Sequence, residues 1–387
     1  MKVNVKSKAK PWDKWIPGVL RNKQVYNLLD TYFIGSQKAN VKASATDLTL
    51  SNRGWRLIKG SVKPSKGGDN YFENLQVSGL IEPIQPLENG DYLLDSKQTY
   101  LFELNETLYQ PDTGFSIYGE ATAKSSVGRM DVLARLIVDG MDYYEKFDPD
   151  KIKRGQQVKM YVEVTPITFD VKVRRGISLN QLRLFNGKPS ISLVTGSEIC
   201  TTIITNESSN LESSLSVDLK PSEGYTSKIV AFRAIPPSDK KIYLPLWECK
   251  ESEKPKANQF WDALPPENSG RLVVGKGNFY IMRSRERISV PLGIAVYCKA
   301  VDETIGEMRI HYAGFAHPYF GYKRKDHKIG APLVFEVRGH DVDVNLCDGE
   351  ILAKLLFYRM SEDSTLKEMS YSNQELNLST YFTKFEG

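Results

Sequence analysis

Two stretches of the sequence are similar to each other and decide the fold: YVEVTPITFDVKVRRGISLNQLRLF at 161–185 and VFEVRGHDVDVNLCDGEILAKLLFY at 334–358. A glutamate, a turn glycine and a terminal aromatic residue coincide at a constant spacing, without a gap: Glu163 with Glu336, Gly176 with Gly349 and Phe185 with Tyr358. Self-similarity at a fixed interval is typical of a duplicated structural unit. We therefore predict two tandem copies of one fold, residues 1–195 and 196–387.

The local pattern within each copy indicates β-structure. Short runs rich in Val, Ile, Tyr, Phe and Thr are separated by Gly, Pro, Asn and Asp, which is typical of an all-β sandwich or barrel. These runs cover 91–104, 158–164, 168–175, 272–282, 291–300 and 331–339. Helical periodicity is confined mainly to 22–33, and a second short helix is predicted near 366–369.

Composition excludes several classes of protein. The 387 residues include 52 Lys and Arg against 47 Asp and Glu, a balance too mild for a protein that coats nucleic acid. No run of 18 apolar residues predicts a membrane span, and the first 23 residues lack the apolar core of a signal peptide. The four cysteines are widely spaced and unpaired with histidines at ligand spacing, so we expect free thiols in the cytoplasm and no zinc site.

One polar cluster interrupts the first copy, at KSSVGR (124–129). The second copy has KAVDET at the aligned position (299–304), without the serines and the arginine. In return it carries a Gly- and aromatic-rich hairpin, HYAGFAHPYFGY (311–322), where the first copy has IVDGMDYYEKF (137–147). The two copies thus keep complementary parts. Taken alone, the two serines of the first copy fit a plain turn. Free N–H groups and hydroxyls beside Lys124 also suit phosphate oxygens.

These residues carry a family resemblance. The order KSSVGR, an Ala-Gly hairpin, a strand glutamate and DGEILAKLLFYRM (348–360) resembles the dCTP deaminases of the dUTPase-like superfamily, in their two-domain branch. The resemblance extends to GVLRNKQVYNLL (18–29), SATDLTLSNRGWRL (44–57) and the tail SYSNQELNLSTYF (370–382). It implies a distorted β-barrel, a trimeric arrangement of barrels, and nucleotide sites between neighbouring barrels. The implied reaction converts dCTP and water to dUTP and ammonia without zinc.

The resemblance also assigns roles. Ser125 and Arg129 would be catalytic, Glu336 or Glu163 would shuttle protons, and the Ala313 carbonyl would orient the attacking water. Substrate-binding residues would be Lys124, Ser126, Tyr312, Gly314, Phe315, Tyr371 and Gln374. Mg²⁺ would arrive on the triphosphate of the dCTP substrate, with no protein cage.

The chemistry of the residues agrees with this assignment. Zinc deaminases need H-x-E and P-C-x-x-C to hold the metal that activates water, and neither motif occurs here. A metal-free route needs a glutamate with a tuned pKa in a dry pocket, and an arginine for the developing charge. Because the copies keep complementary parts, we expect one site to combine Ser125 and Arg129 with Ala313 and Glu336, within one chain or between chains. Glu336 is then the first choice for the proton shuttle and Glu163 the reserve.

Several alternatives remain at this stage. Glu336 stands between Phe335 and Val337, so strand alternation also fits a solvent-facing side chain. The hairpin ends His317-Pro318-Tyr319 where the family pattern is Asp-Pro-Gly, which leaves sugar recognition and hairpin shape open. A protein that also or instead cleaves dUTP would use an Asp base in a hairpin, for which Asp139 and Asp142 are available. A catalytically inactive nucleotide-binding module is the third alternative.

Overall fold

The structure is a computed structural model that describes part of the chain. The described residues are 11–65, 70–111, 116–206, 213–222, 225–238, 241–301, 308–311, 314–322, 330–365 and 374–386. Within them the chain is mostly β-structure with a few short helices, as predicted from the sequence. None of the helices among these residues is long and apolar enough to cross a membrane.

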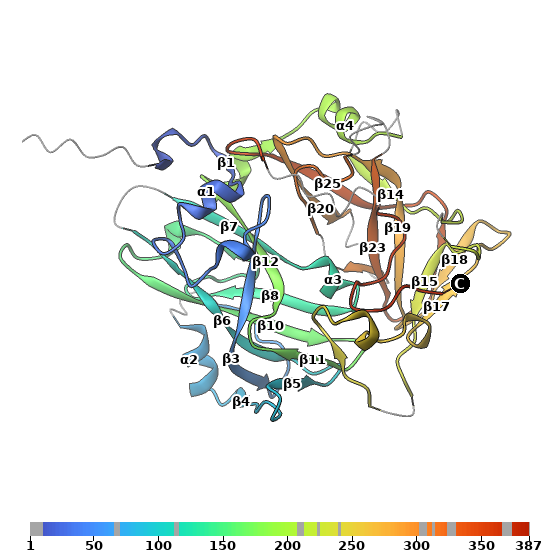
Figure 1. Cartoon of the computed structure of the whole chain (residues 1–387), viewed down its shortest axis with the longest axis horizontal. Coiled ribbons are helices and arrows are strands. Elements are labelled where there is room, and N and C mark those ends of the chain that lie inside the picture. Colours follow the sequence, from blue (N-terminus) through green and yellow to red (C-terminus); the bar gives the residue numbers. More distant parts are fainter. Residues whose placement is uncertain are drawn as a thin grey trace, which may run out of the picture.

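The first half of the chain, blue to green in Figure 1, is built on a ten-stranded sheet curved into a distorted barrel. The main path runs β8-β10-β6-β3-β12-β7-β9, and β1, β2 and β4 pair at its sides. The strands are β1 (Gly18–Val19), β2 (Phe33–Ile34), β3 (Thr46–Leu57), β4 (Ile81–Pro83), β6 (Tyr100–Tyr109), β7 (Ile117–Ala123), β8 (Val132–Val138), β9 (Lys146–Phe147), β10 (Gln157–Pro166) and β12 (Ser178–Asn186). Two further strands, β5 (Asp91–Leu94) and β11 (Val171–Arg174), pair with each other.

The second half, yellow-green to red in Figure 1, contains two five-stranded sheets and one two-stranded sheet within its described residues. One has the order β17-β15-β19-β23-β21, and the other combines β13, β25, β20 and β22 with β14. The strands are β13 (Leu193–Val194), β14 (Ser214–Ser216), β15 (Ala231–Ala234), β16 (Leu244–Pro245), β17 (Trp261–Leu264), β18 (Arg271–Val274), β19 (Phe279–Ile288), β20 (Ile294–Ala300), β21 (Met308–His311), β22 (Phe315–Ala316), β23 (Ala331–Gly339), β24 (Val344–Cys347) and β25 (Ile351–Arg359).

The two halves repeat one pattern of strand pairing. β10 lies between β6 and β8, as β23 lies between β19 and β21. β12 lies between β3 and β7, as β25 lies between β14 and β20. The glycines that coincide in the sequence repeat, Gly176 and Gly349, both have left-handed backbones, with φ of 83° and 86°. This conformation favours glycine, which explains why the turn glycine recurs in both copies.

Helices are short: α1 (Asn22–Tyr26), α2 (Tyr71–Val77), α3 (Ser125–Gly128) and α4 (Ser197–Ile203). Short 3₁₀ helices occur at Pro11–Lys14, Lys38–Asn40, Pro149–Lys151, Pro189–Ser192, Glu251–Glu253 and Ala257–Gln259. The helix predicted over 22–33 ends early, because Asp30 has a left-handed backbone (φ 63°) and the chain turns into β2. The helix predicted near 366–369 lies outside the described residues.

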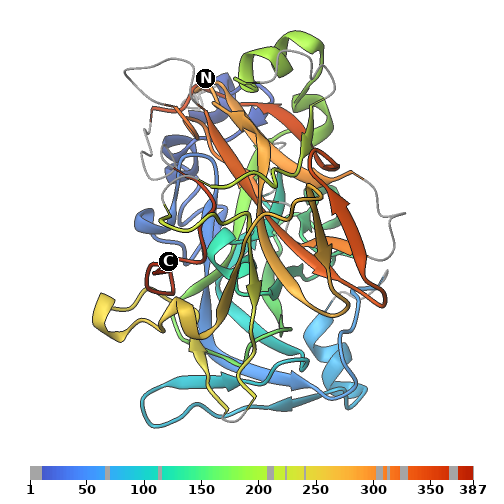
Figure 2. The same ribbon diagram turned by 90° about the vertical axis from the view of Figure 1, so that its right-hand side faces the viewer.

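The two halves pack against each other. In Figure 2 the orange and red strands of the second half lie in front of the first half. β16 of the second half pairs in parallel with β11 of the first. The Phe185 and Tyr358 rings, which are equivalent in the sequence repeat, meet edge to face with centroids 5.3 Å apart. Arg338 of β23 forms an ion pair with the buried Asp131 of the first half, at 2.5 Å. The division predicted at residue 195 falls in the segment that joins the two halves, between β13 and helix α4 (Ser197–Ile203).

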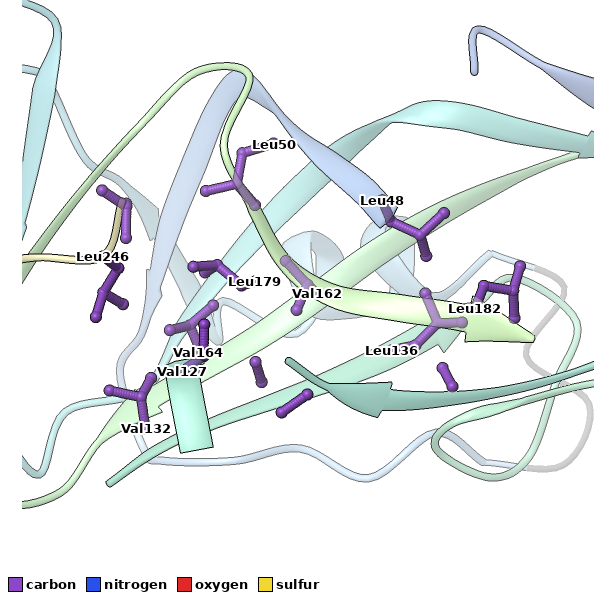
Figure 3. Close-up of a cluster of buried hydrophobic side chains, with 14 of the residues drawn as sticks. Leu48, Leu50, Val127, Val132, Leu136, Val162, Val164, Leu179, Leu182 and Leu246 are labelled. Atoms are coloured by element: carbon purple, nitrogen blue, oxygen red, sulfur yellow. The ribbon is translucent and has the colours of Figure 1, made fainter. Parts of the chain in front are cut away.

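The core of the first barrel continues into the contact between the halves. Figure 3 shows its centre, where Val127 of α3 and Leu246 of the second half pack beside the leucines and valines of the barrel strands. An aromatic cluster extends this core: Phe169, 1% exposed, meets the rings of Phe260, Trp261 and Phe382 at centroid distances of 6.0, 5.8 and 6.3 Å. The C-terminal tail therefore forms part of the core.

Replacing Phe169 with Ala is expected to lower the free energy of unfolding by about 3–5 kcal/mol, because the variant loses buried area and leaves a cavity. Chemical denaturation followed by fluorescence measures the change. Ile16→Ala, at a position 52% exposed, is the control and should change stability little. An equal effect of the two variants would mean that the aromatic cluster does not hold the halves together.

Candidate functional site

A cavity of about 370 Å³ lies between the two halves of one chain. The first half contributes α3 and its flanks, the second half contributes β20, β22 and β23, and the tail closes one side. The lining residues are Ala123, Lys124, Ser125, Ser126, Arg129, Gln181, Glu248, Cys298, Ala300, Gly314, Phe315, His317, Phe320, Leu333, Val334, Phe335, Glu336, Gln374, Ser379 and Thr380. The structure thus brings the two complementary sequence motifs to one place.

The KSSVGR cluster forms a turn of helix at the end of β7. Lys124 keeps an extended backbone, and its carbonyl accepts hydrogen bonds from the N–H groups of Val127 and Gly128, which starts α3. Val127 is fully buried and anchors the turn, while Ser125 is exposed towards the cavity. The Lys124 ammonium lies 2.9 Å from Asp47 Oδ2. Figure 1 places this turn where the two halves face each other.

Arg129 connects this turn to the C-terminal tail. Its guanidinium donates to the carbonyl oxygens of Asn377 (3.2 Å) and Leu378 (3.4 Å), and to Gln374 Oε1 (3.4 Å). Ser126 donates to the Tyr381 hydroxyl at 3.0 Å. These contacts fix the tail against the cavity, so a motif near residue 125 and a segment 250 residues later form one wall.

Glu336 also lines the cavity, on β23, the strand that lies between β19 and β21. Its side chain is only 3% exposed and lines the cavity, so the alternative of a solvent-facing glutamate is wrong. Burial raises the pKa of its carboxyl well above the usual value; the charge of Arg129 lowers this pKa and that of Asp131 raises it, both by less. A carboxyl whose pKa is raised by burial suits acid–base work.

The equivalent residue of the first half, Glu163, has a different environment. It forms a 2.5 Å ion pair with Arg135 and accepts hydrogen bonds from Ser61 (2.9 Å) and Tyr144 (3.2 Å). Its side chain is fully buried and does not line the cavity. The charge of Glu163 is therefore compensated within the first barrel.

The hairpin of the second half contributes Gly314, Phe315 and His317 to the cavity. Tyr319 stands where the family pattern has glycine and has a left-handed backbone, with φ of 75°. Its ring packs on Tyr322 with centroids 4.4 Å apart. The turn thus keeps a conformation that favours glycine, with a tyrosine in it. Three residues that were also predicted for the site, Tyr312, Ala313 and Tyr371, lie outside the described residues.

Sequence reasoning missed several residues of this region. Arg183 is fully buried and donates to the carbonyl oxygen of Val296, across the contact between the halves. An arginine inside the apolar run QLRLF was the available signal. Ser379 and Thr380 of the tail also line the cavity, in a segment that only its family resemblance distinguishes in the sequence. Thr380 donates to Glu248, which had no distinguishing pattern.

The described residues contain no group of three or more His, Cys, Asp or Glu side chains arranged to hold a metal ion. Glu336 and Glu248 are the carboxylates among the residues that line the cavity.

Two tandem β-barrels with a cavity between them are typical of the dUTPase-like fold, and a buried carboxyl beside an arginine and two serines is suited to hydrolysis. Two family models match the chain: the 2′-deoxycytidine 5′-triphosphate deaminase N-terminal domain over residues 16–188 and its C-terminal domain over residues 195–382. The chain belongs to the 2′-deoxycytidine 5′-triphosphate deaminase family.

A solved structure is similar over nearly the whole chain. It is the crystal structure of 2′-deoxycytidine 5′-triphosphate deaminase from Agrobacterium tumefaciens, with 26% sequence identity and a TM-score of 0.77. The similarity covers 90% of this chain and 99% of that one. A search of curated proteins found no match.

The raised pKa of Glu336 predicts a pH-dependent effect on stability. The folded protein binds the proton of the Glu336 carboxyl more tightly than the unfolded protein does. The free energy of unfolding therefore falls as pH rises from 4.5, the ordinary pKa of the group, to the raised pKa in the folded protein. Glu336→Gln stays neutral and is expected to be more stable than the wild type at pH 8, with a difference that shrinks towards pH 5. Each pKa unit of elevation corresponds to about 1.4 kcal/mol.

Thermal unfolding at the two pH values measures this difference. A Glu336→Gln variant that is less stable than the wild type at pH 8 would mean that the glutamate is ionised and compensated in the folded chain.

Proposed function

We propose that the chain catalyses the hydrolytic deamination of dCTP to dUTP and ammonia, and that the cavity between its two barrels is the active site. Membership of the deaminase family supports the reaction. The observation that carries the site is the position of Glu336, a buried carboxyl that lines one cavity together with Ser125 and Arg129. We assign Lys124 and Ser126 to phosphate binding and Ser125 to the catalytic group beside Arg129, with Mg²⁺ entering on the triphosphate as part of the substrate.

The proposed proton path runs through Glu336. The protonated carboxyl donates to N3 of the cytosine ring, which makes C4 more electrophilic. The resulting carboxylate takes a proton from the water that attacks C4 and passes it to the amino group, which leaves as ammonia. The proton of the new C4 hydroxyl then returns to the carboxylate as the C4 carbonyl forms. The positive charge of Arg129 lowers the pKa of Glu336, so it stabilises the carboxylate form in this path.

The path needs no zinc, and the sequence lacks both motifs that zinc deaminases use. Activity is therefore expected to survive treatment with a zinc chelator once Mg²⁺ has been restored. Release of ammonia from dCTP, measured before and after chelation, tests this expectation. Loss of activity that only added zinc restores would contradict the proposed path.

A dUTP-cleaving or bifunctional enzyme is the second candidate from the sequence. Its proposed bases are placed elsewhere: Asp139 accepts a hydrogen bond from the Tyr71 N–H at 2.9 Å, and Asp142 pairs with Lys151. Neither aspartate is among the residues that line the cavity. The geometry therefore favours deamination over phosphate cleavage at this site.

One assay separates the three functions that the sequence leaves open. Purified protein is incubated with dCTP and Mg²⁺, and the products are identified. Ammonia with dUTP supports the deaminase, and ammonia with pyrophosphate and dUMP supports the bifunctional enzyme. If dCTP is bound but not converted, a parallel incubation with dUTP distinguishes a diphosphatase, which releases pyrophosphate and dUMP, from the inactive module. The trimeric arrangement of barrels implied by the resemblance and the cytoplasmic location expected from the cysteines stay predictions.

A further inference from the structure

His317 is a buried histidine in the cavity wall whose two ring nitrogens have different surroundings. The side chain is 8% exposed and directly follows β22 within the hairpin of the second half. Its Nδ1 lies 2.8 Å from the hydroxyl oxygen of Ser44, a buried residue of the first barrel. The other nitrogen, Nε2, makes no hydrogen bond to any residue that the structure describes.

The contacts of Ser44 decide which nitrogen carries the proton. A hydroxyl has one hydrogen to donate and two lone pairs to accept with. The Arg183 guanidinium has only hydrogens to offer, and it donates to Ser44 Oγ at 3.4 Å. Among the described residues, His317 Nδ1 is the acceptor left for the Ser44 hydrogen. Because a buried hydroxyl hydrogen is costly to leave without a partner, Nδ1 accepts and Nε2 bears the hydrogen.

The imidazole also stays neutral. Burial lowers the pKa of His317 to about 3, and the positive charges of Arg183 and Lys42 act in the same direction. The neutral ring therefore keeps a single arrangement throughout the physiological pH range: an acceptor at Nδ1 that is satisfied, and a donor at Nε2 that is not.

Arg183 holds this part of the wall in place. It is fully buried and donates to the carbonyl oxygens of Val296 (3.0 Å) and Ala316 (3.4 Å), and its guanidinium lies 3.9 Å from the centre of the Phe315 ring. The first barrel thus fixes the hairpin on both sides of Ala316. A donor on so rigid a wall is suited to select among ligands, since little ordering entropy is lost on binding.

We propose that His317 donates its Nε2–H to an acceptor oxygen on the nucleoside part of the nucleotide, and so contributes to substrate specificity. The inference rests on the proposed function, because it takes the cavity to hold a nucleotide. The phosphates are assigned to the α3 side of the cavity, which leaves the base carbonyl oxygen and the 3′ oxygen of the sugar as acceptors for this donor.

Two substitutions at the same position test the proposal. The amide nitrogen of Gln reaches about as far as Nε2, whereas that of Asn reaches only about as far as Nδ1. His317→Asn is expected to weaken binding of Mg²⁺-dCTP about tenfold, equivalent to about 1.4 kcal/mol, and His317→Gln to weaken it clearly less. A role confined to the contact with Ser44 predicts the reverse order, and that order, or equal affinities, would overturn the proposal.

Calorimetric titration of Mg²⁺-dCTP into variants that also carry Glu336→Gln measures affinity without turnover, and thermal unfolding confirms that each variant is folded. Repeating the titration with 2′,3′-dideoxycytidine triphosphate identifies the acceptor. If the difference between Asn and Gln disappears, the acceptor is the 3′ oxygen; if it persists, the acceptor is the base carbonyl, and both results support the donor role. Turnover by the wild type is assayed separately, so equal affinities in an active enzyme reject this inference alone.

Discussion

Replacing Glu336 with Gln is expected to lower the rate of dCTP deamination by about 10³-fold or more, within the range found for general acid–base catalysis. The amide has nearly the shape of the carboxyl, so it preserves the packing of β23 while it cannot take up and return a proton. The rate of ammonia release at saturating dCTP measures the effect, and dCTP binding confirms that the cavity is intact.

The sequence repeat supplies a matched control. Glu163→Gln makes the same change at the equivalent strand position, where the carboxylate is paired with Arg135 and lies outside the cavity. This variant is expected to lose stability, because Arg135 loses its charged partner, and to keep turnover while folded. Loss of turnover in Glu163→Gln with a nearly silent Glu336→Gln would place the chemistry in the first barrel and reject the shared cavity.

Replacing Arg129 with Ala is expected to remove at least about 100-fold of turnover, or about 2.7 kcal/mol of transition-state stabilisation. The variant loses the positive charge that acts on Glu336 and the hydrogen bonds that fix the tail. Ser125→Ala is expected to have an effect of similar size without disturbing the tail. Initial rates at several dCTP concentrations separate losses in kcat from losses in binding.

Arg53→Ala is a suitable control for these rates, since Arg53 is half exposed, pairs with Glu103 and lies outside the cavity lining. Arg129→Lys separates the two roles of the arginine, because Lys keeps the charge but loses the planar fork. Near-normal rates in both Arg129→Ala and Ser125→Ala would mean that the KSSVGR cluster is a plain turn without a catalytic role.

The fold was accessible from the sequence because its signals are local and repeated. All six apolar runs singled out in the sequence contain strands. Strand alternation and turn glycines persist in both copies, so each copy supported the assignment of the other. The helix near the start was harder, because a single residue, Asp30, adopts a left-handed backbone that the pattern around it does not reveal.

The site was accessible only in part. Four charged or hydroxyl-bearing residues within KSSVGR indicate a site, and the sequence repeat indicates Glu336 as its carboxyl group. The burial that raises the pKa of Glu336 depends on packing between the two halves, which no local pattern records. The partners of Arg129 lie about 250 residues away in the tail, and their backbone carbonyls leave no mark in the sequence.

The cavity also has a kinetic consequence. Its walls come from both barrels and the tail of a single chain, so bringing them together is a unimolecular step that does not depend on protein concentration. Barrels encoded as separate chains would have to meet again after each dissociation, whereas a covalent connection keeps the partner at a high effective concentration. One copy can then lose its serines and the other its hairpin without any risk that a molecule assembles with two incomplete halves of the same kind.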